Sequence, residues 1–486
     1  MMGDYMFNNC SKLEHFDYKL GGEASPARSG DNDIWQTSGM NNLTSAYYMF
    51  AGTKITSFYR DLPELTNGGW MFANVDTLIN VDTYDEESGE EMEILKGKGG
   101  FDALEDGGHM FDSTSIVSFY RDLPSLTNGD SMFYHTKLKV FANGDVNNLT
   151  NASNMFAGCS ELTTFYSSMS SLAIHGNMLS SCNNLERFYC DLSSLILGDD
   201  MFKNFSKLST FYSDLSSLTH STSMFEECAE LANFDAKLDK VLIADRMFYN
   251  CGSLTGFYNN LSECTSATDT FRGCRSLQNI KSDLTKIQNV DGMFKTCVSL
   301  ENFKSNLQSA TSASETFADC TSLKIFECNM EKLTNGDNMF STCGALTNFW
   351  SNLSSLQSAN NMFSSCTNLE RFEADMPSLP SGNQMFKDLT KLNFFKGNLT
   401  SMTMGREMFY NCTSLSTFDS TMMRVEDCTG MFYNCIALTN FTPYISSIKI
   451  GNDMFNGCKN LMYFSQHMNE LTEGRAMFYN CTSLLT

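Results

Sequence analysis

Basic side chains are scarce in this sequence. Among its 486 residues, 33 Lys and Arg stand against 56 Asp and Glu, which gives a formal net charge of −23 at pH 7. Nucleic acids and anionic membrane surfaces attract clustered Lys and Arg, so we expect neither as a partner. No stretch approaches the roughly 18–20 apolar residues of a membrane span, so no membrane insertion is expected. The opening residues, MMGDYMFNNC, contain no basic region and no apolar run, so no signal peptide is visible.

Sequence patterns of catalysis and metal binding are also missing. The six histidines are scattered and share no HExxH motif, and no GxSxG, Walker or GxGxxG sequence occurs. No CxxC pair offers a tetrahedral zinc site. The acidic stretch at about 85–100 lacks the DxDxDG spacing of a calcium loop, and we interpret it as a solvated loop. We therefore expect no enzyme, no cofactor and no metal site.

What the sequence does contain is a repeat. A Met-Phe pair opens most units, and from Phe133 onward the anchor phenylalanine recurs at a fixed step of 23 residues, with Leu179 filling one place. A constant period of this length is typical of a stacked solenoid. The anchor phenylalanines are Phe133, Phe156, Phe202, Phe225, Phe248, Phe271, Phe294, Phe317, Phe340, Phe363, Phe386, Phe409, Phe432, Phe455 and Phe478.

The spacing within each unit predicts the fold of a coil. Counting the anchor as position 0, a small or apolar residue stands at 3, Leu at 6, a second Phe at 9, Leu or Met at 13 and an aliphatic residue near 16. No helical spacing persists across a unit. The pattern predicts a leucine-rich-repeat type of repeat solenoid, with one short parallel β-strand per coil of about 23 residues, turns, and short helical or 3-10 segments.

The period is interrupted twice, near the N-terminus. From Phe7 to Phe50 and from Phe72 to Phe111 the spacing exceeds one repeat, and the surplus residues have loop composition. We expect one solenoid over residues 1–486, with insertions at about 21–40 and 85–100.

The 18 cysteines follow the repeat. Fourteen of them stand at position 3, where other units carry Thr, Val, Phe or Leu. A place that accepts such different side chains is a packing position, so we predict a column of buried thiols. Coils spaced by about 4.8 Å leave disulfides between neighbours open as an alternative.

The segments Met247–Phe257, Met408–Phe418 and Met454–Phe464 share the run MFxxCxxLxxF. This run resembles the AFxxCxxLxxI core of BspA-like leucine-rich repeats, and it is also similar to the MFxxCxxL repeats of mycoplasma-type surface lipoproteins. Where the BspA-like pattern has Ile-x-Ile-Pro, this chain has an FYSDL-like segment, as at Phe211–Leu215. The resemblance implies a surface adhesin or interaction scaffold that binds proteins or glycans through its sheet face.

Alternation along a strand predicts which side chains face solvent. With the second Phe inward, positions 10 and 12 point outward. Aromatic and acidic residues at these positions form a candidate ligand-binding strip, because aromatic faces stack on sugar rings or apolar groups while carboxylates accept hydrogen bonds. Its members are Tyr59, Asp61, Tyr120, Asp122, Tyr166, Tyr189, Asp191, Tyr212, Asp214, Tyr258 and Trp350.

A structural interpretation of the same columns stays open. Stacked Tyr and Asn side chains also stabilise parallel strands without binding anything. Position 10 changes character along the chain, to Lys281, Lys304, Glu327, Glu373 and Asp419, and a purely structural column does not need this change. We therefore expect the N-terminal half of the column to be the binding surface.

Two hypotheses about function follow. The first is a non-enzymatic recognition or adhesion protein of the cell surface or extracellular space. The second is a structural component of a larger assembly, such as a phage virion fibre or a self-stacking filament. It rests on the lack of polar capping coils, which solenoids ordinarily use to cover their terminal edges and whose absence suggests self-association.

Overall fold

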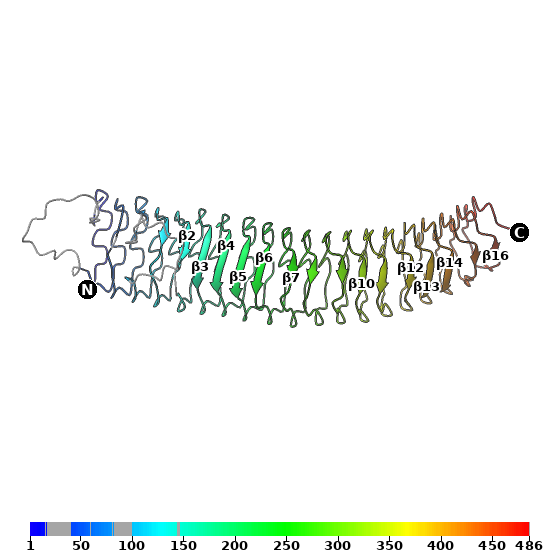
Figure 1. Ribbon diagram of the computed structural model, residues 1–486, viewed down its shortest axis with the longest axis horizontal. Helices are drawn as coiled ribbons and strands as arrows, with labels where there is room; N and C mark the ends of the chain where they lie inside the picture. Colours follow the sequence, from blue (N-terminus) through cyan, green and yellow to red (C-terminus); the bar gives the residue numbers. More distant parts are fainter. Residues whose placement is uncertain are drawn as a thin grey trace, which may run out of the picture. The chain divides into compact units, whose positions relative to one another are not determined.

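The computed structural model describes residues 1–14, 16, 40–58, 60–79, 81, 100–142 and 146–485. The chain divides into two units, Met1–Leu238 and Asp239–Thr486. In both units it winds through successive coils, and strands of neighbouring coils run in parallel (Figure 1). The predicted fold class is confirmed: a parallel β-solenoid with roughly 23 residues per coil. A single domain over 1–486 stays a prediction, and the insertions at about 21–40 and 85–100 lie, except for Met40 and Gly100, outside the described residues.

The first unit carries one parallel sheet of six strands in chain order. Each pairs with the strand one coil further on, so that Phe165 lies beside Phe188 and Phe188 beside Phe211. The 23-residue period of the sequence thus sets the register of the sheet, because residues one period apart pair with each other. The strands are β1 (Ser118–Phe119), β2 (Val140–Ala142), β3 (Thr164–Ser168), β4 (Arg187–Asp191), β5 (Thr210–Asp214) and β6 (Asn233–Ala236).

The second unit repeats this arrangement in shorter sheets. They consist of β7 and β8, of β9 to β11, of β12 to β14, and of β15 and β16, all parallel. The strands are β7 (Gly256–Phe257), β8 (Asn279–Ile280), β9 (Asn302–Phe303), β10 (Ile325–Glu327), β11 (Asn348–Trp350), β12 (Arg371–Glu373), β13 (Phe394–Asn398), β14 (Thr417–Thr421), β15 (Asn440–Phe441) and β16 (Tyr463–Phe464).

Two columns of phenylalanine rings fill the core. Anchor rings stack face to face, as for Phe202 and Phe225, whose centroids lie 5.3 Å apart at an interplanar angle of 0°. Rings of position 9 form a second stack, with Phe188 and Phe211 5.4 Å apart, and meet the anchors edge to face. Both geometries are favoured between aromatic rings. One coil cannot cover its own rings, so each coil depends on its neighbours for burial.

The turn around the anchor differs from the predicted helical or 3-10 segment, since the described residues contain turns and no helix there. Alternate amides bond to the next coil: Arg246, Phe248 and Asn250 donate to carbonyls 22 residues ahead at 2.7–2.8 Å. Residues two places before and after the anchor take positive φ, for example 59° at Asn250 and 78° at Gly273. Asn and Gly tolerate this conformation best, which explains their frequency after the Met-Phe pair.

The cysteine column is buried, as predicted, except at its two ends, where Cys10 is exposed and Cys481 is half-buried. All eighteen cysteines are free thiols. In most coils the thiol donates to the carbonyl of the anchor phenylalanine one coil earlier, as from Cys274 to Phe248 and from Cys320 to Phe294, each at 3.1 Å. Burial raises the pKa of Cys159 to about 11 and that of Cys458 to about 12. Thiols with such pKa values are protonated at neutral pH and chemically inert.

Arg121 bridges the coils around the second interruption. It occupies the inward place that is Ser or Ala in many coils, and only 3% of it is exposed. Its Nε donates to the Val81 carbonyl at 2.9 Å, and its Nη1 donates to the Arg60 carbonyl at 3.2 Å and to Asp61 Oδ1 at 3.0 Å. The guanidinium carbon lies 5.0 Å from the centre of the Phe101 ring. One side chain therefore ties together segments up to 61 residues apart.

Candidate functional site

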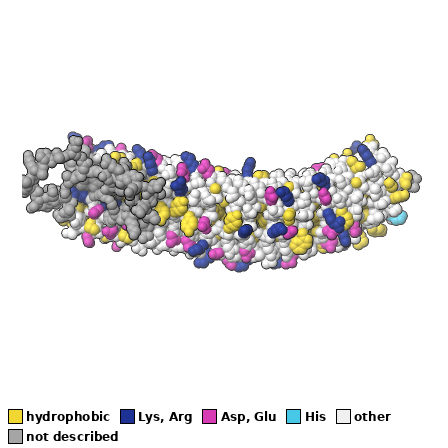
Figure 2. All heavy atoms as spheres, viewed as in Figure 1, with side chains coloured by type: hydrophobic (Ala, Val, Ile, Leu, Met, Phe, Trp, Pro, Cys, Tyr) yellow, Lys and Arg dark blue, Asp and Glu magenta, His cyan; other side chains and the backbone are white. Residues whose placement is uncertain are grey.

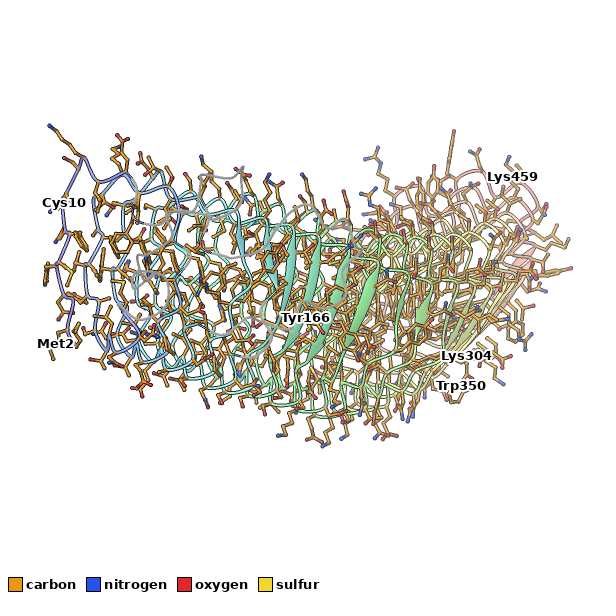
Figure 3. The ribbon with its side chains drawn as sticks, turned by 60° about the vertical axis from the view of Figure 1, so that its left-hand side comes forward. Met2, Cys10, Tyr166, Lys304, Trp350 and Lys459 are labelled. Atoms are coloured by element: carbon orange, nitrogen blue, oxygen red, sulfur yellow. The ribbon has the colours of Figure 1, made fainter. Side chains whose placement is uncertain are left out.

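The exposed side of the sheet in the first unit carries three tyrosines in register. Tyr166 in β3 pairs with Tyr189 in β4, which pairs with Tyr212 in β5. The burial pattern of β3 alternates as predicted, with Phe165 and Ser167 inward and Tyr166 outward (labelled in Figure 3). Tyr212 is 58% exposed, Tyr166 43%, and Tyr189 is half-buried between them. The rings of Tyr166 and Tyr189 lie 6.3 Å apart and tilted by 46°.

The acidic residues beside these tyrosines cap turns. Asp191 and Asp214 each accept the backbone N–H two residues further on, from Ser193 and Ser216, at 2.9 Å. Asp214 also pairs with Lys237 at 2.5 Å, and the hydrogen bond from Lys237 is the largest cause that lowers the pKa of this carboxyl. One oxygen of each carboxylate is thus committed to the fold, in the turn that Asp and Asn form with their own backbone.

The predicted residues nearest the N-terminus are less accessible as a group. Tyr120 and Asp122 are half-buried. Asp61 is exposed and pairs with Arg121. Tyr59 lies outside the described residues. The structure therefore brings together Tyr166, Tyr189 and Tyr212 with Asp191 and Asp214, and it leaves the other first-unit residues outside this cluster.

Tyr258 and Trp350 belong to the second unit. Tyr258 follows β7 and is 62% exposed, with Lys281 Nζ 5.7 Å from the centre of its ring. Trp350 ends β11 and is 66% exposed. Its nearest strand partner at the same level is Glu327 of β10. Trp350 has no ring-stacking or cation–π partner among the residues that the structure describes.

Beside Trp350 the strand side of the second unit is hollowed by a shallow depression of about 500 Å³. It spans three coils, and Figure 3 shows Lys304 and Trp350 on the same side of the unit. Trp350 was predicted as a site residue from the sequence, and its neighbours were not. The change of position 10 to Lys and Glu was the available signal. The lining residues are Lys304, Ser305, Asn306, Glu327, Cys328, Asn329 and Trp350.

Charges on these coils are mostly paired. Lys304 Nζ lies 3.2 Å from Glu327 Oε2, and Glu373 pairs with Arg371. On the face shown in Figure 2, basic and acidic side chains are interspersed and apolar ones form small groups. Exposed pairs of this kind contribute little to stability. Because Lys304 and Glu327 are paired, the hollow has no extended field of one sign. An ionic ligand therefore has no electrostatic advantage over a neutral one there.

Two further features concern metals and membranes. Within the described ranges, no cluster of three or more His, Cys, Asp or Glu side chains is arranged to hold a metal ion. None of the segments that the structure describes forms a helix of the length and apolarity needed to cross a bilayer.

Comparisons with known proteins agree with the repeat geometry. The family model of the BspA type leucine rich repeat region matches residues 127–255, 241–370 and 359–485. No match was found among curated proteins.

Several solved structures also match the chain. A leucine-rich repeat protein from Bacteroides ovatus is 17% identical, with 73% of this chain and 88% of that chain covered and a TM-score of 0.36. A leucine rich cell surface protein from Faecalibacterium prausnitzii is 20% identical, with 60% and 82% covered and a TM-score of 0.30. The functional domain of InlJ from Listeria monocytogenes, which includes a cysteine ladder, is 15% identical, with 74% and 66% covered and a TM-score of 0.28.

Proposed function

The chain belongs to the BspA-type leucine-rich repeat family, and from this premise we propose that it is a non-enzymatic recognition protein of the cell surface or extracellular space. It binds a protein or glycan through the exposed side of its strands. This family typically mediates protein interactions and includes surface proteins. The proposed contact residues are the in-register tyrosines Tyr166, Tyr189 and Tyr212, with Tyr258 and Trp350 in the second unit.

One observation carries the proposal. Most of the phenylalanines are buried in the core, yet Tyr166, Tyr212 and Trp350 at the neighbouring strand position are exposed. Exposed Tyr and Trp side chains are the residues that most often dominate protein interfaces. The second carboxylate oxygen of Asp191 flanks the tyrosines and is available to accept a hydrogen bond, whereas both oxygens of Asp214 are engaged, by the Ser216 N–H and by Lys237.

Replacing Tyr166, Tyr189 and Tyr212 together by Ser should weaken ligand binding by about 100-fold or more, because each truncated interface tyrosine can cost on the order of 2 kcal/mol. The unfolding temperature should change little, since two of the three rings are exposed. Glycan and protein arrays probed with the wild-type chain identify the ligand, and titration of the variant measures the loss.

Tyr479→Ser is the matched control, because Tyr479 is equally exposed but lies on the turn side of its coil. It should bind like the wild type. A triple variant that loses stability but keeps its affinity would show that the tyrosines only stabilise the sheet. Light scattering on the same sample separates the hypotheses: a monomer of about 54 kDa that binds an array ligand supports recognition, whereas an obligate polymer supports the structural assembly.

A further inference from the structure

We propose that the hollow beside Trp350 is a saccharide subsite, which holds one pyranose unit of a neutral glycan against the indole ring. This inference rests on the proposed recognition function and narrows its ligand class at one place. The hollow of about 500 Å³ falls within the range of roughly 300–1,000 Å³ that small-molecule sites occupy. It is open on one side, so a longer chain of sugars can continue beyond it.

The indole ring of Trp350 has an open face. Two of the exposed tyrosines proposed as contact residues have neighbours over or beside their rings: Tyr166 lies near Tyr189, and Lys281 lies over Tyr258. Trp350 has no such ring neighbour in the described part of the chain, and its side chain is more exposed than those of Tyr166 and Tyr258. A free aromatic face next to polar groups offers stacking to the C–H face of a sugar ring.

The side-chain amide of Asn329 differs from those of its neighbours in the same column. Asn306 and Asn352 occupy the same place one coil before and one coil after, and each accepts a backbone N–H of its own turn, from Gln308 at 2.9 Å and from Ser354 at 3.0 Å. The Asn329 side chain makes no hydrogen bond to any residue that the structure describes. Its amide can therefore donate and accept at once, which is what two neighbouring sugar hydroxyls require.

The two charged side chains that line the hollow balance each other. Lys304 and Glu327 lie 3.2 Å apart, and both are about half exposed. Together they supply donors and acceptors to hydroxyl groups while their charges cancel. A cationic peptide side chain would meet the ammonium of Lys304, and an anionic ligand would meet the carboxylate of Glu327. A neutral polyol is repelled by neither group, so the lining favours an uncharged sugar over an ionic ligand.

The test uses the full chain and a panel of neutral oligosaccharides, namely cello-, manno-, malto- and chito-trioses, titrated calorimetrically. At least one should bind with millimolar or better affinity. Trp350→Ala should reduce that affinity by about tenfold or more, as expected for loss of a stacking face, and Trp350→Phe should restore part of it. Asn329→Ala should weaken binding severalfold through the lost hydrogen bonds. Asn352→Ala removes a turn cap outside the hollow and should leave the affinity unchanged.

Thermal unfolding of each variant shows that it is folded. If no saccharide binds while the array ligand still depends on Tyr166, Tyr189 and Tyr212, the saccharide subsite is rejected and the recognition function stands. If a saccharide binds equally to the wild type and Trp350→Ala, the hollow is not its site, and the inference also fails. If Trp350→Ala abolishes binding of a protein while no sugar binds, the hollow is a protein contact and the ligand class proposed here is wrong.

Discussion

Replacing Phe317 by Ala should lower the free energy of unfolding of the second unit by about 3–5 kcal/mol, the range for Phe-to-Ala changes in a packed core. The Phe317 ring is fully buried. It stacks on Phe294 at 5.3 Å and on Phe340 at 5.4 Å, and it meets Phe303 at 4.8 Å and Phe326 at 5.3 Å edge to face. Truncation leaves a cavity between three coils, because neither neighbouring ring can close it.

Urea unfolding followed by circular dichroism measures the effect. Phe317→Leu should cost less, on the order of 1.5 kcal/mol or below, since it keeps most of the volume. The chain itself carries a buried Leu179 in one anchor place, which indicates that this place accepts Leu. Tyr463→Ala, at an exposed strand position, is the surface control and should fall within about 0.5 kcal/mol of the wild type. A loss below about 1 kcal/mol for Phe317→Ala would mean that the ring columns are not the core.

Arg121→Ala should destabilise the first unit by about 2–4 kcal/mol, because it leaves buried carbonyl oxygens without their donors. The carbonyls of Val81 and Arg60 both accept hydrogen bonds from this guanidinium. Gly100 is fitted to it as well: its φ is 135°, and a Cβ there would collide with Arg121 Nη1 and Asp61 Oδ1. The arginine thus fills the space where the regular coil is interrupted.

The same unfolding experiment distinguishes hydrogen bonding from charge. Arg121→Lys should recover little of the loss, since one ammonium cannot reach the positions of both Nε and Nη1. Asp61→Asn should cost less than about 1 kcal/mol, because the Asp61 side chain is 67% exposed and its ion pair is screened by water. Equal losses for Asp61→Asn and Arg121→Ala would assign the effect to the ion pair and contradict the bridging role.

The repeat made most of the fold predictable, because the period fixes the register. Once Phe165, Phe188 and Phe211 are known to recur at one step, a solenoid places them side by side. Alternation then assigns Tyr166 and Tyr212 to the exposed side. The buried thiols were predictable for a similar reason, since a place that tolerates Cys, Thr and Leu has no demanding chemistry. Their hydrogen bonds to anchor carbonyls were not, because these depend on the backbone path of the turn.

The features of the site that the sequence did not predict depend on the local geometry of the backbone. Whether Asp191 is free or caps a turn depends on the direction of the N–H two residues later, which spacing does not reveal. The same uncertainty hid Asn329, whose neighbours Asn306 and Asn352 look identical in the sequence but are engaged. The inward place that Ser167 and Ala236 fill in other coils is filled by the buried side chain of Arg121 in one coil, and its burial was not predicted. That exception depends on an interruption of the coil, and the repeat pattern contains no information about it.

Alkylation of the native protein at neutral pH, mapped by mass spectrometry, tests the stacking of the coils most directly. The thiols are shielded only if each coil covers the next. Of the eighteen cysteines, exposed Cys10 should react quickly and half-buried Cys481 slowly, while the sixteen buried thiols react only after unfolding in denaturant. Rapid modification of thiols in the middle of the repeat, such as Cys274, Cys320 or Cys412, in the folded protein would contradict a solenoid whose coils bury one another.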